Sequence, residues 1–298
     1  MKKLGMVLLM VGLTWPVLLA DYSSKKNTTG DYESASTWIS PGKFNGPPPV
    51  DGNVKQALII ETGSIVTRNG DFNPVTVTVN GRFIVNGNYT NNQGGGVTVE
   101  KDAVLEIFGD LAASANITVK GGGTLIVHGN LTSSNAGIES HGDLIVVGDF
   151  STASSTTVKN TGNLVVGGNF THLGGGFTVN GDLSDTKVYI LNPEAVITAP
   201  DWSLVNDPAI IGNLEDFLQD EGTSDLGKIV TDAIIAVSPI FGYQWKTTNV
   251  NSSWSTGSNW AGNIAPKADY HVRIKASTGS YPEIVMSDRI VEIKDLTI

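Results

Sequence analysis

Leu125-Ile-Val-His-Gly-Asn-Leu131 is the third of five similar segments, and the spacing of these segments decides the fold. The other four are Phe83-Ile-Val-Asn-Gly-Asn-Tyr89, Leu105-Glu-Ile-Phe-Gly-Asp-Leu111, Leu144-Ile-Val-Val-Gly-Asp-Phe150 and Leu164-Val-Val-Gly-Gly-Asn-Phe170. The glycine before each Asn or Asp lies at positions 87, 109, 129, 148 and 168, so successive segments are 22, 20, 19 and 20 residues apart. A repeat of about 20 residues predicts a solenoid, in which every repeat forms one coil.

Each repeat contains two runs that are typical of strands. Alternation places Leu125, Val127, Gly129 and Leu131 on one side of the chain, and the same positions hold apolar residues or Gly in the other segments. The earlier runs are Val75-Thr-Val-Thr-Val79, Val97-Thr-Val99, Ile117-Thr-Val119, Thr157-Val158 and Phe177-Thr-Val179. Neither run can bury its apolar face alone, whereas stacked coils join these faces into one core. The sequence therefore predicts an all-β fold, a parallel β-solenoid (β-helix) of about seven coils that bends at the glycine.

The residue after this glycine alternates between neutral and acidic. It is Asn88, Asp110, Asn130, Asp149 and Asn169 in turn. The short side chains of Asn and Asp suit a left-handed corner or a hydrogen bond to nearby backbone. Adjacent strands lie about 4.8 Å apart, so aspartates in successive coils would repel each other. The alternation therefore indicates that the coils stack in register.

The chain begins with a pattern that is typical of an export signal. Lys2 and Lys3 precede an apolar run over 4–19, and Ala20 precedes a polar stretch. This pattern predicts a signal peptide over 1–20, with a retained membrane anchor as the alternative. The chain has no cysteine, which excludes disulfides and a thiolate nucleophile.

The net charge argues against two classes of partner. The chain carries 19 basic and 29 acidic residues, and removal of the two lysines of the signal changes the net charge from −10 to −12. We therefore expect no nucleic-acid partner and, after signal removal, no membrane partner. With 40 % hydrophobic and 16 % charged residues, the composition is that of a folded protein. The predicted location is the secreted, extracellular cell surface.

The remaining composition divides the chain into further segments. Residues 21–56 are polar and contain a proline run at 47–49 that cannot donate to a β-ladder, so we expect an entry or cap segment before a solenoid over 57–200. Residues 201–242 are predicted to be a helical cap or linker. A helix over 206–218 would start at Asp207-Pro208, and a second helix would cover 226–237. We expect these helices to close the open end of the solenoid.

Residues 243–298 look like the start of a second β-rich module. Trp254, Trp260, Pro266 and a strand at 272–274 repeat the order of Trp38, Pro49 and the strand at 57–60. The chain ends in another strand-like run, Lys294-Asp-Leu-Thr-Ile298, so we expect this module to continue in a longer protein or to pair with something.

The segment Tyr243-Gln-Trp-Lys-Thr-Thr-Asn-Val-Asn-Ser-Ser-Trp254, with Tyr281-Pro282 and Leu296-Thr-Ile298, resembles the entry to β-strand repeats in large secreted proteins of Bacteroidota. The resemblance implies a surface adhesin or filament component, often exported by type IX secretion.

No residue pattern predicts catalysis or a cofactor. Acidic residues are scattered, and Glu139 with Asp143 is the nearest approach to the paired carboxylates of a glycosidase. His128, His141 and His172 fall in different parts of their coils, so we interpret them as surface residues. We therefore assign no catalytic, cofactor or metal residue.

Two weaker alternatives stay open. Asp110 and Asp149 are the candidates for a calcium site, although the Gly-Gly-x-Gly-x-Asp calcium repeat is absent. Trp38, Trp254 and Trp260 could stack on sugar rings, or could pack over the first coil of a module.

The leading hypothesis is a non-enzymatic extracellular structural or adhesive β-solenoid: a surface adhesin, stalk or filament subunit. Its partners would be surface glycans, other copies of itself or neighbouring modules. The alternative is a carbohydrate-active β-helix enzyme or a sugar-binding module.

Overall fold

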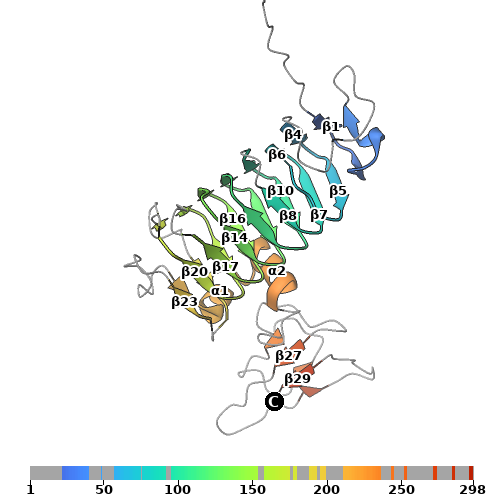
Figure 1. The fold of residues 1–298 in the computed structure, drawn as a ribbon. Helices are drawn as coiled ribbons and strands as arrows, with labels where there is room; N and C mark the ends of the chain where they lie inside the picture. Colours follow the sequence, from blue (N-terminus) through green and yellow to red (C-terminus); the bar gives the residue numbers. More distant parts are fainter. Residues whose placement is uncertain are drawn as a thin grey trace, which may run out of the picture.

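A computed structural model of the chain shows a parallel β-solenoid (Figure 1). It describes residues 22–39, 48, 57–74, 76–91, 95–153, 158–174, 177–179, 188–192, 195–198 and 211–235, and short strands between 243 and 297. The predicted signal peptide lies outside these residues. None of the helices within them is long and apolar enough to cross a membrane.

Three sheets, here called A, B and C, surround one core. Sheet A contains β1 (Tyr22–Ser24), β3 (Trp38–Ile39), β4 (Ala57–Ile60), β6 (Thr76–Val79), β9 (Val97–Val99), β12 (Ile117–Val119), β15 (Ile138–Ser140), β18 (Val158–Asn160) and β21 (Phe177–Val179). Sheet B contains β2 (Thr29–Asp31), β5 (Ile65–Asn69), β7 (Arg82–Asn86), β10 (Val104–Ile107), β13 (Thr124–Val127), β16 (Asp143–Val146), β19 (Leu164–Val166), β22 (Val188–Ile190) and β24 (Ile211–Gly212). Sheet C contains β8 (Tyr89–Asn91), β11 (Leu111–Ala113), β14 (Leu131–Ser133), β17 (Phe150–Thr152), β20 (Phe170–His172) and β23 (Ile197–Thr198).

Each complete coil has three strands rather than the two that the sequence predicts. The bend at Gly129 separates β13 from β14, so that one predicted run becomes two strands in different sheets. Since every complete coil contributes one strand to six-stranded sheet C, the described residues form six complete coils. The third strand is only three residues long, which is too short for alternation to distinguish it from a turn.

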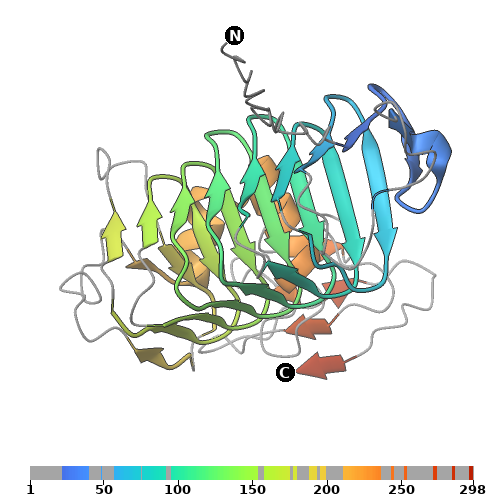
Figure 2. The same ribbon diagram turned by 45° about the horizontal axis from the view of Figure 1, so that its top comes forward.

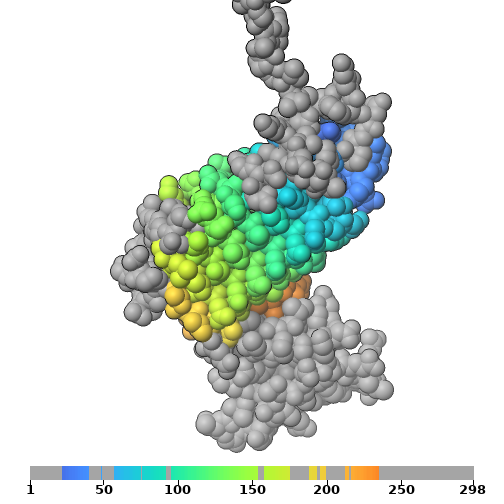
Figure 3. All heavy atoms as spheres, viewed as in Figure 1, coloured from blue at the N-terminus to red at the C-terminus, as the bar shows by residue number. Residues whose placement is uncertain are grey.

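The core consists of equivalent residues stacked along the solenoid. Leu125 is 0 % exposed, and it pairs in register with Leu105 and Leu144 in the neighbouring coils. Phe150 and Phe170 stack in the same way, with ring centroids 5.1 Å apart and planes 4° from parallel. The inward positions predicted from the segments are therefore confirmed, and Figure 3 shows the successive coils as ordered bands of colour.

The first coil begins earlier than the sequence predicts. The strands were expected from Ala57, but β1 and β2 already pair in parallel with β4 and β5. Strand β3 then runs antiparallel to β1 and forms the edge of sheet A. Thr29-Gly-Asp31 has no apolar alternation, and it is held as a strand by its register with Ile65, Val66 and Thr67.

The helices also differ from the prediction. Helix α1 spans Leu214–Asp220, α2 spans Asp225–Val230, and η2 continues over Thr231–Ile235. The predicted start at Asp207-Pro208 lies outside the described residues, and β24 occupies part of the predicted helix. A reciprocal pair sets the start of α1: Asn213 N–H donates to Asp216 Oδ2 at 2.8 Å, and Asp216 N–H donates to Asn213 Oδ1 at 3.2 Å.

The helical segment 214–235 lies on the outer face of sheet B, which corrects the expectation that it closes the end of the solenoid (Figures 1 and 2). Phe217, Val230 and Ile234 pack there against outward side chains of four successive coils. These outward side chains are Ile126, Ile145, Val165 and Tyr189. An apolar stripe on an outer face is stabilised by burial, and the amphipathic helical segment covers it.

The C-terminal strands are parallel as well. Strands β25 (Tyr243–Gln244), β27 (His271–Arg273) and β29 (Asp295–Thr297) form one sheet, and β26 (Ser252–Ser253) pairs with β28 (Ile284–Val285). Strand β27 falls within one residue of the predicted strand at 272–274, and β29 lies within the strand-like run predicted at 294–298.

Candidate functional site

The corner residues form a continuous ladder of hydrogen bonds. The Oδ1 atom of each ladder residue accepts from a backbone N–H in the next coil, at 2.7–2.9 Å. The ladder residues are Asp71, Asn88, Asp110, Asn130, Asp149 and Asn169, and the last of them accepts from Val196. Of the two roles predicted for Asn and Asp, bonding to backbone is therefore the observed one. None of the ladder residues has a positive φ.

The ladder also accounts for the calcium candidates. Asp110 and Asp149 each commit Oδ1 to the ladder, and Asn130 lies between them. Within the part of the chain that the structure describes, no three residues among His, Cys, Asp and Glu come together as a metal-binding group. The structure thus does not bring further ligands to either aspartate.

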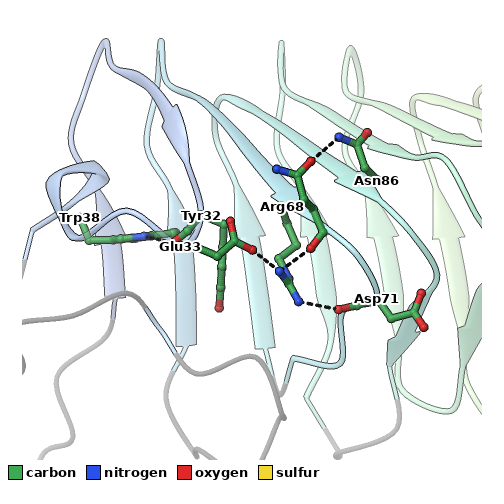
Figure 4. A network of polar contacts seen from close by, with 7 residues as sticks. Tyr32, Glu33, Trp38, Arg68, Asp71 and Asn86 are labelled. Carbon is green, nitrogen blue, oxygen red and sulfur yellow. Dashed lines mark hydrogen bonds and ion pairs between the residues drawn. The ribbon is translucent and has the colours of Figure 1, made fainter.

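Trp38 lies at the N-terminal end of the core, where it is 3 % exposed (Figure 4). Its Nε1 donates to the Tyr32 carbonyl at 2.8 Å, and the two rings meet edge to face at 5.3 Å. The Arg68 guanidinium lies 5.8 Å from the Tyr32 ring centroid and pairs with Glu33. A buried indole packs over the first coil and offers no free face to a sugar. Trp254 and Trp260 lie outside the described residues.

The three histidines lie on different parts of the solenoid. His128 is on the outer face of sheet B, and His141 follows β15 at a corner. His172 is only 2 % exposed, and its Nδ1 lies 2.6 Å from Thr152 Oγ1 inside the core. The interpretation of all three as surface residues is therefore wrong for His172. His172 lies two residues after the inward Phe170 in β20, so strand alternation places it on the inward face as well.

A polar relay lies on the outer face of sheet A. Glu139 Oε1 is 3.2 Å from His141 Nε2, and His141 Nδ1 is 2.5 Å from Thr161 Oγ1. Glu139 also lines a groove of about 380 Å³ together with Asn116, Ile117, Thr118, Gly137, Ile138 and Lys159. In an arrangement of this kind the carboxylate can orient the imidazole, and the imidazole can accept the proton of the hydroxyl group.

Asp143, predicted as the nearest partner of Glu139, lies on a different sheet. It begins β16 in sheet B, where Asn163 Nδ2 donates to its Oδ1 at 3.0 Å. Burial raises the pKa of the Asp143 carboxyl, and the charge of Glu221 raises it further, while the bond from Asn163 opposes both. The two acidic residues therefore do not form the carboxylate pair that glycoside hydrolysis requires.

A second cluster, the Phe108 patch, lies on sheet B beyond the helical segment. We define it by Arg82, Ile84, Asn86, Glu106, Phe108 and His128. Arg82 Nη2 donates to Glu106 Oε2 at 2.6 Å, and His128 Nε2 lies 3.1 Å from Glu106 Oε1. The hydrogen bond with His128, followed by the bond and charge of Arg82, lowers the pKa of the Glu106 carboxyl, although burial opposes the shift.

Sequence reasoning missed the Phe108 patch, although a signal was present. Phe108 and His128 occupy the position just before the glycine in successive segments, which faces outward. An aromatic residue there, over a histidine one repeat later, predicts a stacked pair once in-register stacking is assumed.

No protein-family model, curated protein or solved structure gives a significant match to this chain.

Proposed function

We propose that this protein is a non-enzymatic extracellular rod that acts as an adhesin, stalk or filament subunit. The observation that carries the proposal is one hydrophobic core that continues along the solenoid axis from Tyr22 to Ile190. The ladder of hydrogen bonds at the corner runs parallel to this core. Every coil adds the same core layer and the same ladder bond, so the shape is rigid along its axis. A rigid, extended body suits a protein that holds binding groups away from a surface.

The outer face of sheet C supports the same proposal. Its outward central positions carry short side chains in register: Thr90, Ala112, Thr132, Ser151, Thr171 and Thr198. Short side chains leave the sheet flat and lose little conformational entropy when a partner covers them. Such a face suits contact with a repeating partner, such as a glycan chain or another copy of the rod.

Export to the cell surface is part of the proposal. It rests on the basic and apolar residues of 1–20, which follow the pattern of an export signal. A core that closes through burial and backbone pairing needs no disulfide for stability outside the cell.

One observation favours an enzyme as the second candidate. The Glu139–His141–Thr161 relay lies beside a groove that also presents the Lys159 ammonium group, so a base and a cation lie close to a space that a sugar could enter. Against it, the side chains of His141 and Glu139 are 40 % and 47 % exposed. Bulk water competes for both groups and weakens a relay of this kind.

Incubation of the purified protein with a panel of neutral and acidic polysaccharides separates the two candidates. The proposal predicts retention on immobilised polysaccharide or lateral self-association, with no release of oligosaccharides. Release of oligosaccharides that is lost in His141→Ala, and retained in the exposed corner variant Lys120→Ala, would contradict the non-enzymatic proposal and support the enzyme.

A further inference from the structure

The Phe108 patch combines an exposed aromatic ring with satisfied polar neighbours. Phe108 is 51 % exposed, and one face of its ring stacks on His128 with centroids 4.3 Å apart and planes 5° from parallel. The two rings occupy neighbouring coils, because Ile107 and Val127 are paired in register just before them. His128 therefore holds the Phe108 ring in one orientation on the surface.

The other face of the ring is directed toward the preceding coil. The register that pairs Ile107 with Val85 places Phe108 beside Asn86. Asn86 Nδ2 donates to Asn69 Oδ1, at 2.8 Å, in the coil beyond (Figure 4). Asn86 thus lies between Asn69 and Phe108, and because its side chain is shorter than that of phenylalanine, the outer part of this ring face stays open to a ligand.

Hydrogen-bonding groups surround this open face. Arg82 has a side chain that is 48 % exposed, and its bond to Glu106 leaves donors of the guanidinium group for a ligand. The Asn86 amide lies on the same side, and the half-buried Ile84 forms the floor between them. Glu106 is largely buried and accepts from both Arg82 and His128, so it fixes both side chains in place.

These groups fit a neutral sugar better than other ligands. A pyranose has an apolar C–H face that stacks on an aromatic ring and hydroxyls that bond to amide and guanidinium groups at its rim. Glu106 balances the charge of Arg82, and the chain as a whole carries −10, so an anionic ligand would be repelled. A stable protein interface covers about 800 Å² on each partner, far more than one exposed ring offers.

We propose that the Phe108 patch is a binding site for a neutral hexopyranose, with Phe108 as the stacking platform and Arg82 and Asn86 as the hydrogen-bonding rim. This inference deepens the adhesive function proposed above and rests on it. The site is shallow and holds one sugar ring. Affinity for a free monosaccharide is therefore weak, on the order of 1 mM, and a polysaccharide contacted by several rods binds more tightly.

Titration of the full-length protein with glucose, galactose, mannose and their oligosaccharides, followed by the NMR signals of the His128 ring, tests the site. The chain has four histidines, and comparison with His128→Gln assigns the signal. We expect neutral sugars to shift this signal, Phe108→Ala to weaken binding at least tenfold, and Phe108→Trp to retain it. Leu173→Ala, which removes a comparably exposed leucine directly after β20, is the matched control and should leave binding unchanged.

Three outcomes would overturn the site: no shift by any neutral sugar, stronger shifts by galacturonate than by galactose, or equal binding by Phe108→Ala and the wild type. A parallel assay of adhesion to polysaccharide-coated beads distinguishes this failure from failure of the adhesive function. If wild type and Phe108→Ala adhere equally, the Phe108 site is wrong while the adhesive rod stands. If neither adheres and no sugar shifts the His128 signal, both are wrong.

Discussion

In four successive coils, the glycine before the ladder residue lies against the ladder oxygen of the coil before it; these glycines are Gly109, Gly129, Gly148 and Gly168. A Cβ atom added at Gly129 would lie 2.2 Å from Asp110 Oδ1 and 2.7 Å from the Gly109 carbonyl oxygen. Gly129 does not have a positive φ, so the constraint comes from close packing rather than from backbone conformation. The Gly-Asn and Gly-Asp steps therefore recur because the ladder bond leaves no room for a side chain.

Gly129→Ala is expected to destabilise the protein by about 1–3 kcal/mol, because the added methyl group must push the ladder oxygen or the backbone aside. Urea unfolding followed by circular dichroism measures this change. Gly121→Ala is the control, since its nearest neighbour would be the His141 carbonyl oxygen at 3.6 Å. Equal loss of stability in both variants would contradict the packing explanation.

Asp143 is a residue whose charge opposes folding. Its raised folded-state pKa, caused first by burial and then by Glu221, means that the folded protein binds a proton more readily than the unfolded chain. The resulting penalty is complete above the folded-state pKa and disappears as the pH falls through that pKa toward the unfolded value. Removing this charge should therefore stabilise the protein at neutral pH and have little effect at acidic pH.

Asp143→Asn is expected to raise the free energy of unfolding at pH 7, since the amide keeps an oxygen for the Asn163 bond and carries no charge. The gain should shrink as the pH is lowered to about 4, near the unfolded pKa of aspartate. Thermal melts across this range measure the effect, with the exposed Asp102→Asn as control. A gain that does not depend on pH would contradict the electrostatic cause.

At the level of elements, the outer face of sheet B explains why the helices lie where they do. One buried face requires only alternate apolar residues, yet Leu125-Ile-Val127 and Leu144-Ile-Val146 have three in succession. The middle residues Ile126 and Ile145 face outward, beneath the helical segment. Three apolar residues in succession therefore indicate a second buried face. This could be interpreted only once β13 and β16 were known to be neighbours in one sheet, sheet B.

Phe217→Ala is expected to release the helical segment while the solenoid stays folded. Phe217 is 0 % exposed and meets Tyr189 edge to face, with ring centroids 5.0 Å apart. Loss of a buried phenylalanine costs about 3–5 kcal/mol when the structure cannot rearrange. Hydrogen exchange should show faster exchange over 214–235 and unchanged protection in β13 and β16.

The exposed Gln219→Ala is the control for this variant and should exchange as the wild type does. Simultaneous loss of protection in the helices and in β13 would mean that the helical segment and the solenoid unfold as one cooperative unit.

At the scale of the whole molecule, the repeat period sufficed to predict the fold because every coil contributes to one shared core. The inward Leu and Val positions obey the period, and so do the glycines and the ladder residues. The candidate sites do not obey it. Glu106 and Phe108 lie in one coil, His128 lies 20 positions after Phe108, and only the register brings the histidine to them.

Trp38 had two interpretations from the sequence, stacking on a sugar or packing over the first coil. The structure shows the second, because the antiparallel strand β3 turns the ring into the end of the core. The end of a solenoid exposes the last core layer, and a large aromatic ring is an economical cover for it. The antiparallel direction of β3, which brings Trp38 to this position, could not be predicted from the repeat.

In-register stacking of 20-residue coils is the central claim, and disulfide cross-linking tests it most directly because the chain has no cysteine. Thr98 and Thr118 are register partners on the outer face of sheet A, where adjacent strands lie about 4.8 Å apart. The variant Thr98→Cys with Thr118→Cys should form a disulfide under mild oxidation, since bridged Cα atoms lie about 4.4–6.8 Å apart. Thr98→Cys with Glu139→Cys spans two coils, about 10 Å, and should stay reduced. Cross-linking of the second pair, or failure of the first in the folded protein, would contradict the stacking of the coils.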